Sequence, residues 1–185
     1  MGRPLIAALT ALGATAGTAA AQQPVAPEPQ PTPQSVFREA VLADAGTTAS
    51  IKQLIRTGGG IVAPRPGFAD LTTDGKSDAV VTVDSAGAAG AVAVYVLSSD
   101  GSSTGRLRVV YRNQALYRLR TRLTGTTLTL VVPRWRRGED LCCPSTLVER
   151  DYAWSARRRT LVPRAIRTVP GPGAAPATAQ PAPTR

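Results

Sequence analysis

Residues 79–99 read AVVTVDSAGAAGAVAVYVLSS and contain two runs of β-forming residues. The runs 79–85 and 91–99 are rich in valine, and the small residues between them have turn chemistry. Short runs of this kind, joined by a brief connection, pair as antiparallel strands. The stretch therefore predicts two consecutive strands of an antiparallel sheet.

The same pattern continues downstream of this stretch. Five further runs rich in Val, Leu, Thr and Tyr are predicted to be strands: 106–112, 117–123, 127–135, 146–154 and 160–169. Upstream, Ser35 fits a helix N-cap, and Phe37 and Val41 lie on one face at helical spacing. Residues 50–68 are ambiguous between a short helix and irregular chain. We expect an α+β, mainly β fold, with one N-terminal helix packed on a curled antiparallel meander sheet of five to seven strands.

Both ends of the chain have compositions typical of segments outside a folded domain. Residues 1–21 combine Arg3, an apolar run and three alanines before Gln22, the pattern of a cleaved secretory signal peptide. Residues 22–34 and 170–185 are rich in proline, so we expect a disordered linker and a disordered tail. The prediction is one α+β domain at 35–169, secreted to the cell envelope or beyond, without an integral membrane segment after cleavage.

Positive charge is concentrated in the second half of the chain. The formal net charge is +10, and residues 101–168 hold fifteen arginines against four acidic residues. Side chains alternate between the two faces of a strand, so arginines two residues apart share a face. If strands 106–112 and 117–123 pair, five arginines form one anion-binding surface; otherwise they line an ordinary solvent face. These residues are Arg106, Arg108, Arg118, Arg120 and Arg122.

Residues 68–81, FADLTTDGKSDAVV, place oxygen donors at alternate positions of a loop. The predicted Ca²⁺ ligands are Asp70, Thr72, Asp74, Asp78 and the backbone carbonyl of Lys76. Three carboxylates without a bidentate glutamate imply weak affinity. The alternative is a tight turn in which the aspartates accept hydrogen bonds from nearby backbone N–H groups.

The chain contains two cysteines, Cys142 and Cys143, which are adjacent. Neighbouring Cα atoms lie ~3.8 Å apart, below the usual disulfide range, so a bridge between them forms a strained ring. Export nevertheless favours oxidation. The alternatives are a vicinal disulfide that closes the loop, a disulfide-linked dimer, and a pair of buried thiols. A redox-responsive role follows from the first of these, because a strained disulfide is easily reduced.

Two resemblances follow from these motifs. The run Asp70, Asp74, Gly75, Asp78 and the strand after it resembles the calcium loop of FG-GAP repeats, although the chain holds a single copy. The order of leader, Pro-rich spacer, acidic loop, strands and late CCPS resembles actinobacterial secreted proteins of the LppP/LprE lipoprotein type. The chain has no lipid-attachment cysteine near residue 21, and the resemblance implies no particular activity.

The composition argues against catalysis. The chain has no histidine, which removes the commonest general base and zinc ligand. We therefore expect a non-enzymatic structural or binding module of the bacterial cell envelope. The candidate partner is an anionic wall polymer or polysaccharide. Nucleic acid is not expected, because only Tyr111 and Tyr117 are interleaved with the arginines as stacking platforms.

Overall fold

The computed structural model describes residues 32–99, 101 and 105–174. The predicted signal peptide, residues 22–31 of the linker and residues 175–185 of the tail lie outside the described residues. The elements are α1 (Pro33–Ala43), α2 (Ala49–Thr57), β1 (Ile61–Ala69), β2 (Asp78–Asp84), β3 (Ala91–Ser99), β4 (Leu107–Asn113), β5 (Arg120–Thr124), β6 (Thr127–Arg134), β7 (Thr146–Ser155) and β8 (Thr160–Pro170).

The strands form two antiparallel sheets of four, each connected as a meander. Sheet A has the order β1-β2-β3-β4, and sheet B has the order β5-β6-β7-β8. The mainly β, antiparallel prediction is confirmed. The prediction of a single curled sheet is wrong, since β4 and β5 are edge strands of different sheets and do not pair.

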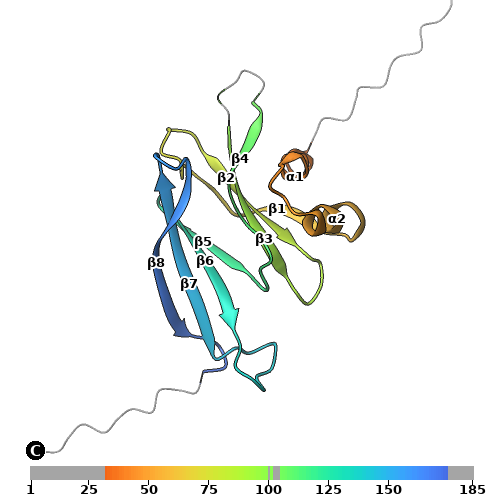
Figure 1. Cartoon of the computed structure of the whole chain (residues 1–185), viewed down its shortest axis with the longest axis vertical. Helices are drawn as coiled ribbons and strands as arrows, with labels where there is room; N and C mark the ends of the chain where they lie inside the picture. The colour runs from red at the N-terminus through yellow and green to blue at the C-terminus, as the bar shows by residue number, and fades with distance from the viewer. Residues whose placement is uncertain (1–31, 100, 102–104, 175–185) are drawn as a thin grey trace, which may run out of the picture. The chain divides into compact units, whose positions relative to one another are not determined.

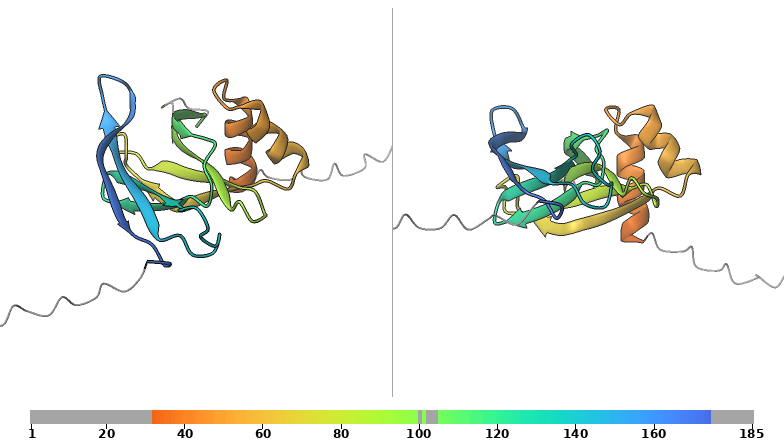
Figure 2. Two further views of the ribbon diagram at one scale, coloured as in Figure 1. Left: turned by 60° about the horizontal axis from the view of Figure 1, so that its bottom comes forward. Right: turned by 90° about the horizontal axis from the view of Figure 1, so that it is seen from below.

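Three layers result, with sheet A in the middle (Figures 1 and 2). Both helices cover one face of sheet A, where Phe37 and Ile55 pack against residues that include Val81. The other face packs against sheet B, with Val80 and Leu130 in a second apolar cluster. Strands β2 and β3 are therefore buried on both faces along most of their length. That burial explains why both strands contain runs of consecutive apolar residues, 79–81 and 91–97, rather than a strict alternation.

The first helix begins earlier than the sequence predicts. Thr32, not Ser35, is the N-cap, and its hydroxyl accepts a hydrogen bond from the backbone N–H of Ser35 at 3.2 Å. Pro33 follows at a position where a missing N–H has no cost, so the helix starts there. Part of the ambiguous segment 50–68 forms the second helix, so the expectation of one helix is wrong. Neither described helix has the length and hydropathy needed to cross a membrane.

Strand β1 is the one strand the sequence did not predict. It contains Pro64, Pro66 and Gly67, and its register with β2 shifts between Pro64 and Gly67. Proline cannot donate a ladder hydrogen bond, but β1 is an edge strand and needs only one bonded side. Because β1 lies at the edge of sheet A, it can form a strand although its composition is typical of a loop.

The break between the sheets lies at residues 114–119. Instead of pairing with β4, this segment turns across the start of β3: the backbone N–H groups of Leu116 and Leu119 donate to Val92 O (2.9 Å) and Ala91 O (3.0 Å). Gln114 anchors the turn, because its side chain bonds to the backbone of Thr48 and Gly46 in the α1–α2 connection. The predicted strand 117–123 therefore begins only at Arg120.

The ordered chain extends past residue 169. The backbone N–H groups of Gly171 and Gly173 donate to Ser145 O (2.9 Å) and Pro144 O (3.1 Å). A Cβ atom at Gly173 overlaps the backbone of Cys143, so this close approach requires glycine. The first residues of the predicted tail are thus hydrogen-bonded to the cysteine loop, residues 135–145.

Candidate functional site

The acidic loop is a set of turns closed by its own aspartates. Both carboxylate oxygens of Asp70 accept backbone hydrogen bonds, from Asp74 N (3.1 Å) and Gly75 N (3.0 Å). Asp74 accepts one from Lys76 N at 2.9 Å. Asp78 is fully buried and accepts from the backbone and hydroxyl of Thr72. The carboxylates thus point at N–H and O–H donors, as in Asx turns.

This arrangement bears on the predicted calcium site. Among the described residues, no group of three acidic or cysteine side chains is arranged to hold a metal ion. For Asp70 and Asp78, an incoming cation has to compete with donors that already occupy both oxygens of each carboxylate. Calcium binding stays a prediction, and the observed hydrogen bonds favour low affinity.

The five predicted anion-binding arginines do not form one surface. The prediction depended on pairing of strands 106–112 and 117–123, which is wrong because β4 and β5 belong to different sheets. Arg106 and Arg108 line a groove of about 840 Å³ between α1 and β4, which also contains Glu39 and Asp44. Arg118 and Arg120 lie elsewhere and line a common pocket, and Arg122 pairs with Glu149.

Arg122 is part of an ion-pair network on the outer face of sheet B, the face turned away from sheet A. Its guanidinium lies 3.4 Å from Glu149, which also pairs with Arg167 at 2.8 Å. Arg167 pairs in addition with Asp151 at 2.5 Å. Hydrogen bonds from Arg167 and Thr129 lower the pKa of Asp151. The charge of Arg122 is therefore balanced locally and is a poor candidate for binding an external anion.

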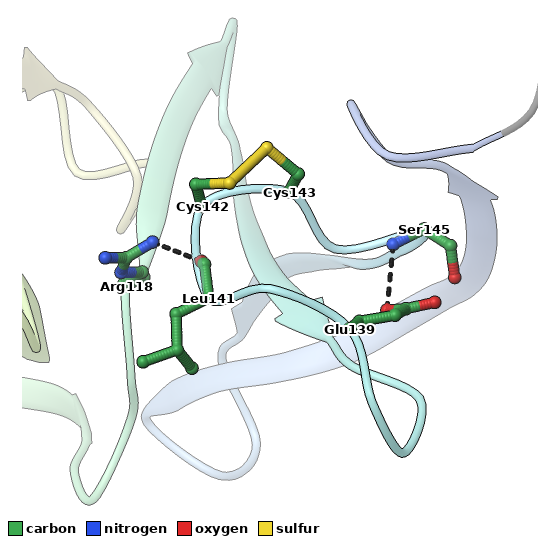
Figure 3. Close-up of a disulfide and its surroundings, with 6 residues drawn as sticks. All are labelled: Arg118, Glu139, Leu141, Cys142, Cys143 and Ser145. Carbon is green, nitrogen blue, oxygen red and sulfur yellow. Dashed lines mark hydrogen bonds between the residues drawn. A yellow bond between two sulfur atoms is a disulfide. The ribbon is translucent and has the colours of Figure 1, made fainter.

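Arg118 ties two loops together rather than pointing into solvent. It lies in the connection before β5 with a positive φ of 49°. Its Nε donates to Ala88 O in the β2–β3 turn at 3.0 Å, and its Nη1 donates to Leu141 O in the cysteine loop (Figure 3). Its guanidinium also lies 5.8 Å from the ring centroid of Tyr117. These contacts fix both the arginine and the loop that it holds.

The cysteine loop carries the predicted vicinal disulfide. The sulfurs of Cys142 and Cys143 are joined, with Cα atoms 3.8 Å apart, and both residues are exposed (Figure 3). The alternative of buried thiols is therefore wrong. Glu139 closes the loop by accepting from Arg136 N (3.0 Å) and Ser145 N (3.1 Å). Hydrogen bonds from Ser145 and Arg136 lower the pKa of the Glu139 carboxyl.

A small pocket lies between the cysteine loop and sheet B. Its volume is about 50 Å³, and Cys142, Trp135, Arg118 and Arg120 contribute to its lining. Trp135 is held in place by an edge-on contact with Tyr117, with ring centroids 5.3 Å apart. The sequence predicted a role for the cysteines and the arginines separately but did not bring them together.

The sequence interpretation also missed a basic cluster at the β7–β8 hairpin tip. We call Arg157, Arg158 and Arg159 the hairpin-tip arginines; all three are exposed. None of them takes part in the ion pairs found in the described part of the chain. Next to them, the hydroxyl of Thr160 donates to Val110 O on β4 at 2.8 Å, which docks the hairpin against sheet A. The run of three arginines was the available signal.

Comparison with known proteins adds no relative, since no family model, no curated protein and no solved structure matches the chain. The resemblances to FG-GAP loops and to LppP/LprE-type lipoproteins remain predictions from sequence motifs.

Proposed function

We propose that this domain is a non-enzymatic binding module of the bacterial cell envelope that holds an anionic polymer on its hairpin-tip arginines. The supporting observation is the contrast between these arginines and those of the adjacent sheet surface. Arg122 and Arg167 are balanced by Glu149 and Asp151, whereas the hairpin-tip arginines have no ion-pair partner among the described residues.

The hairpin tip suits a polymer better than a small ligand. Three consecutive exposed arginines gather positive charge at one turn on the surface. The turn is ordered by Ser155, whose carbonyl accepts from the backbone N–H groups of Arg158 (3.1 Å) and Arg159 (2.7 Å). Repeated sulfate, phosphate or carboxylate groups match such a surface through charge-assisted hydrogen bonds.

Retention on a sulfated-polysaccharide resin tests the proposal. We expect the double variant Arg157→Gln and Arg158→Gln to elute at clearly lower salt than the unmodified protein. The matched control is Lys52→Gln with Arg56→Gln on α2, which removes the same amount of charge from the helix layer. Equal loss of retention in the two double variants contradicts a specific role for the hairpin tip.

Export is part of the same proposal. The pattern of residues 1–21 predicts that the mature protein begins near Gln22. Sequencing the amino terminus of material from the native host checks this. Recovery of Met1 or Gly2 as the first residue argues against secretion and against an envelope ligand.

A redox response of the cysteine loop is a second candidate function. It is favoured by the exposure of both cysteines and by the bond between Arg118 and Leu141 O, which precedes Cys142 directly. A dithiol reductant transfers two electrons and two protons, leaving two thiols on the loop and a disulfide in the reductant. We expect alkylation of two cysteines per chain only after such treatment. Two labels without reductant contradict this candidate.

A further inference from the structure

The charged residues that line the pocket under the cysteine loop are all positive. Arg118 and Arg120 both line it, and none of its described lining residues is acidic. The carboxylate of Glu139, in the same loop, instead accepts backbone N–H bonds from Arg136 and Ser145. By contrast, the larger groove beside α1 contains acidic and basic residues together. The pocket thus presents two cationic groups without an internal counterion among the described residues.

Arg120 is the arginine available to a ligand. Arg118 already donates from Nε and Nη1 to two backbone carbonyls. Arg120 is exposed and takes part in none of the ion pairs found among the described residues, although its strand neighbour Arg122 is paired with Glu149. Arg120 and Val131 are directly opposite each other on β5 and β6, which places the guanidinium beside an apolar side chain.

The remaining walls are apolar and fixed. Val131, Pro133 and Leu147 of sheet B and Pro144 of the loop also line the pocket. The loop itself is held by Arg118, by Glu139, and by the hydrogen bonds from Gly171 and Gly173. A ligand therefore meets a preformed site and has little ordering to do on binding.

Size and shape select the chemical class of the ligand. The volume is about 50 Å³, so the pocket has room only for a small group of a few heavy atoms. A guanidinium presents parallel N–H donors that match the two oxygens of a carboxylate. Apolar walls next to that donor suit a short hydrocarbon attached to the carboxylate.

We propose that the pocket between Arg120, Trp135 and the Cys142–Cys143 ring is a binding site for a small carboxylate carrying a short apolar group. Arg120 supplies the charge, Arg118 fixes the loop and contributes a second positive charge, and Trp135 with the sheet residues contacts the hydrocarbon. This site is separate from the hairpin-tip arginines and does not rest on the proposed function.

Titration with propionate, followed through the indole N–H signals of the two tryptophans, tests the proposal. Trp135 lines the pocket, whereas Trp154 is partly buried against the apolar cluster between the sheets and is an internal control. A Trp154→Phe variant assigns the two signals. We expect a saturable shift of the Trp135 signal at millimolar propionate, with little change for Trp154. Propionamide, the neutral analogue, is expected to bind at least about tenfold more weakly because it lacks the charge.

Two variants of neighbouring residues sharpen the test. Arg120→Gln should weaken propionate binding by about tenfold or more, and Arg120→Lys should weaken it less, since the charge remains but the paired donors are lost. Arg122→Gln, on the same face of the same strand, should bind like the unmodified protein because that arginine already pairs with Glu149. The hairpin-tip double variant should also bind propionate normally.

Three outcomes overturn the proposal: no saturable shift of the Trp135 signal up to about 100 mM propionate, equal binding of propionamide, or equal weakening by Arg120→Gln and Arg122→Gln. The overall amide spectrum reports whether each variant remains folded.

Discussion

The two sheets have the same number of strands and the same antiparallel meander, yet their side chains are used differently. In sheet A, β2 and β3 are buried on both faces, between the helices and sheet B. In sheet B, one face packs against sheet A and the other carries the network of Arg122, Glu149, Asp151 and Arg167. Sheet A therefore supplies most of the core, and sheet B supplies the charged surface.

The comparison indicates that different residues determine the stability of the fold and the binding of anions. Side chains that fill sheet A make apolar contacts on both sides, so a change there is expected to cost stability. Arg120 and the hairpin-tip arginines are exposed and have no ion-pair partner among the described residues, so changes there are expected to alter interactions with anions instead. Substitutions in the two sheets should fall into two distinct groups when stability and binding are both measured.

The largest effect is expected in the core of sheet A. Leu97 on β3 is fully buried against the helices, and Leu97→Ala should lower the free energy of unfolding by about 2–5 kcal/mol. Ile166 on β8 is 65% exposed, and Ile166→Ala should change it by no more than ~0.5 kcal/mol. Urea titration measures both values, and similar costs contradict the assignment of the core to sheet A.

The next effect concerns the glycine that lets the segment after β8 approach the cysteine loop. A Cβ at Gly173 overlaps the backbone of Cys143, so Gly173→Ala should destabilise by about 1–3 kcal/mol through overpacking. Gly87, in the turn between β2 and β3, has no atom nearer than 3.9 Å to such a Cβ and is the matched control. Thermal unfolding of the two variants measures the difference. Equal melting temperatures contradict the close packing of Gly173 against the cysteine loop.

Much of this comparison was available from the sequence, but the division of the strands into two sheets was not. The seven predicted strands overlap β2 to β8, because runs of β-branched residues between turn-forming segments are a local signal. The consecutive apolar residues at 79–81 and 91–97 also indicated that both faces of these strands are buried. Strand β1 was missed because its prolines are tolerated at an edge through tertiary pairing alone.

The candidate site was predictable only in part, for a similar reason. The adjacency of the two cysteines, together with the predicted export, favoured the disulfide, which depends on no distant partner. The arginine surface failed because residues 114–119 bond to the start of β3 and separate β4 from β5. No glycine or proline marks that break in the sequence. Likewise, the contact of Gly173 with Cys143 involves two segments whose proximity no local pattern predicts.

A smaller effect on stability is expected when the pH is lowered, because Glu139 in the cysteine loop becomes protonated. The pKa of Glu139 is lowered by hydrogen bonds from Ser145 and Arg136. A lowered folded-state pKa means that the carboxylate stabilises the fold above its unfolded pKa of ~4.3 and loses this contribution as the pH falls through the folded value. Glu139→Gln should therefore be less stable than the unmodified protein at neutral pH, and the difference should shrink below about pH 4. Urea midpoints across pH measure it; a constant difference contradicts the role of the charge.

The smallest effect is expected from calcium at the acidic loop before β2. If Asp70, Asp74 and Asp78 bind Ca²⁺, a tenfold excess over Kd stabilises the fold by about 1.4 kcal/mol. Because existing hydrogen bonds to the aspartates have to be replaced, we expect this only at millimolar concentrations. Melting temperatures with Ca²⁺, Mg²⁺ and chelator provide the measurement. If the melting temperatures are equal under the three conditions, the loop is a turn that binds no ion.

The most direct test of the central claim is the salt dependence of binding to a soluble sulfated polysaccharide. Each cationic contact releases counterions from a densely charged polymer, so the logarithm of the binding constant falls linearly with the logarithm of salt concentration. We expect Arg157→Gln with Arg158→Gln to reduce this slope by about two. Lys52→Gln with Arg56→Gln should leave the slope unchanged. If both double variants lower affinity equally and share one slope, the protein binds through its overall charge and the hairpin-tip arginines are not the binding site.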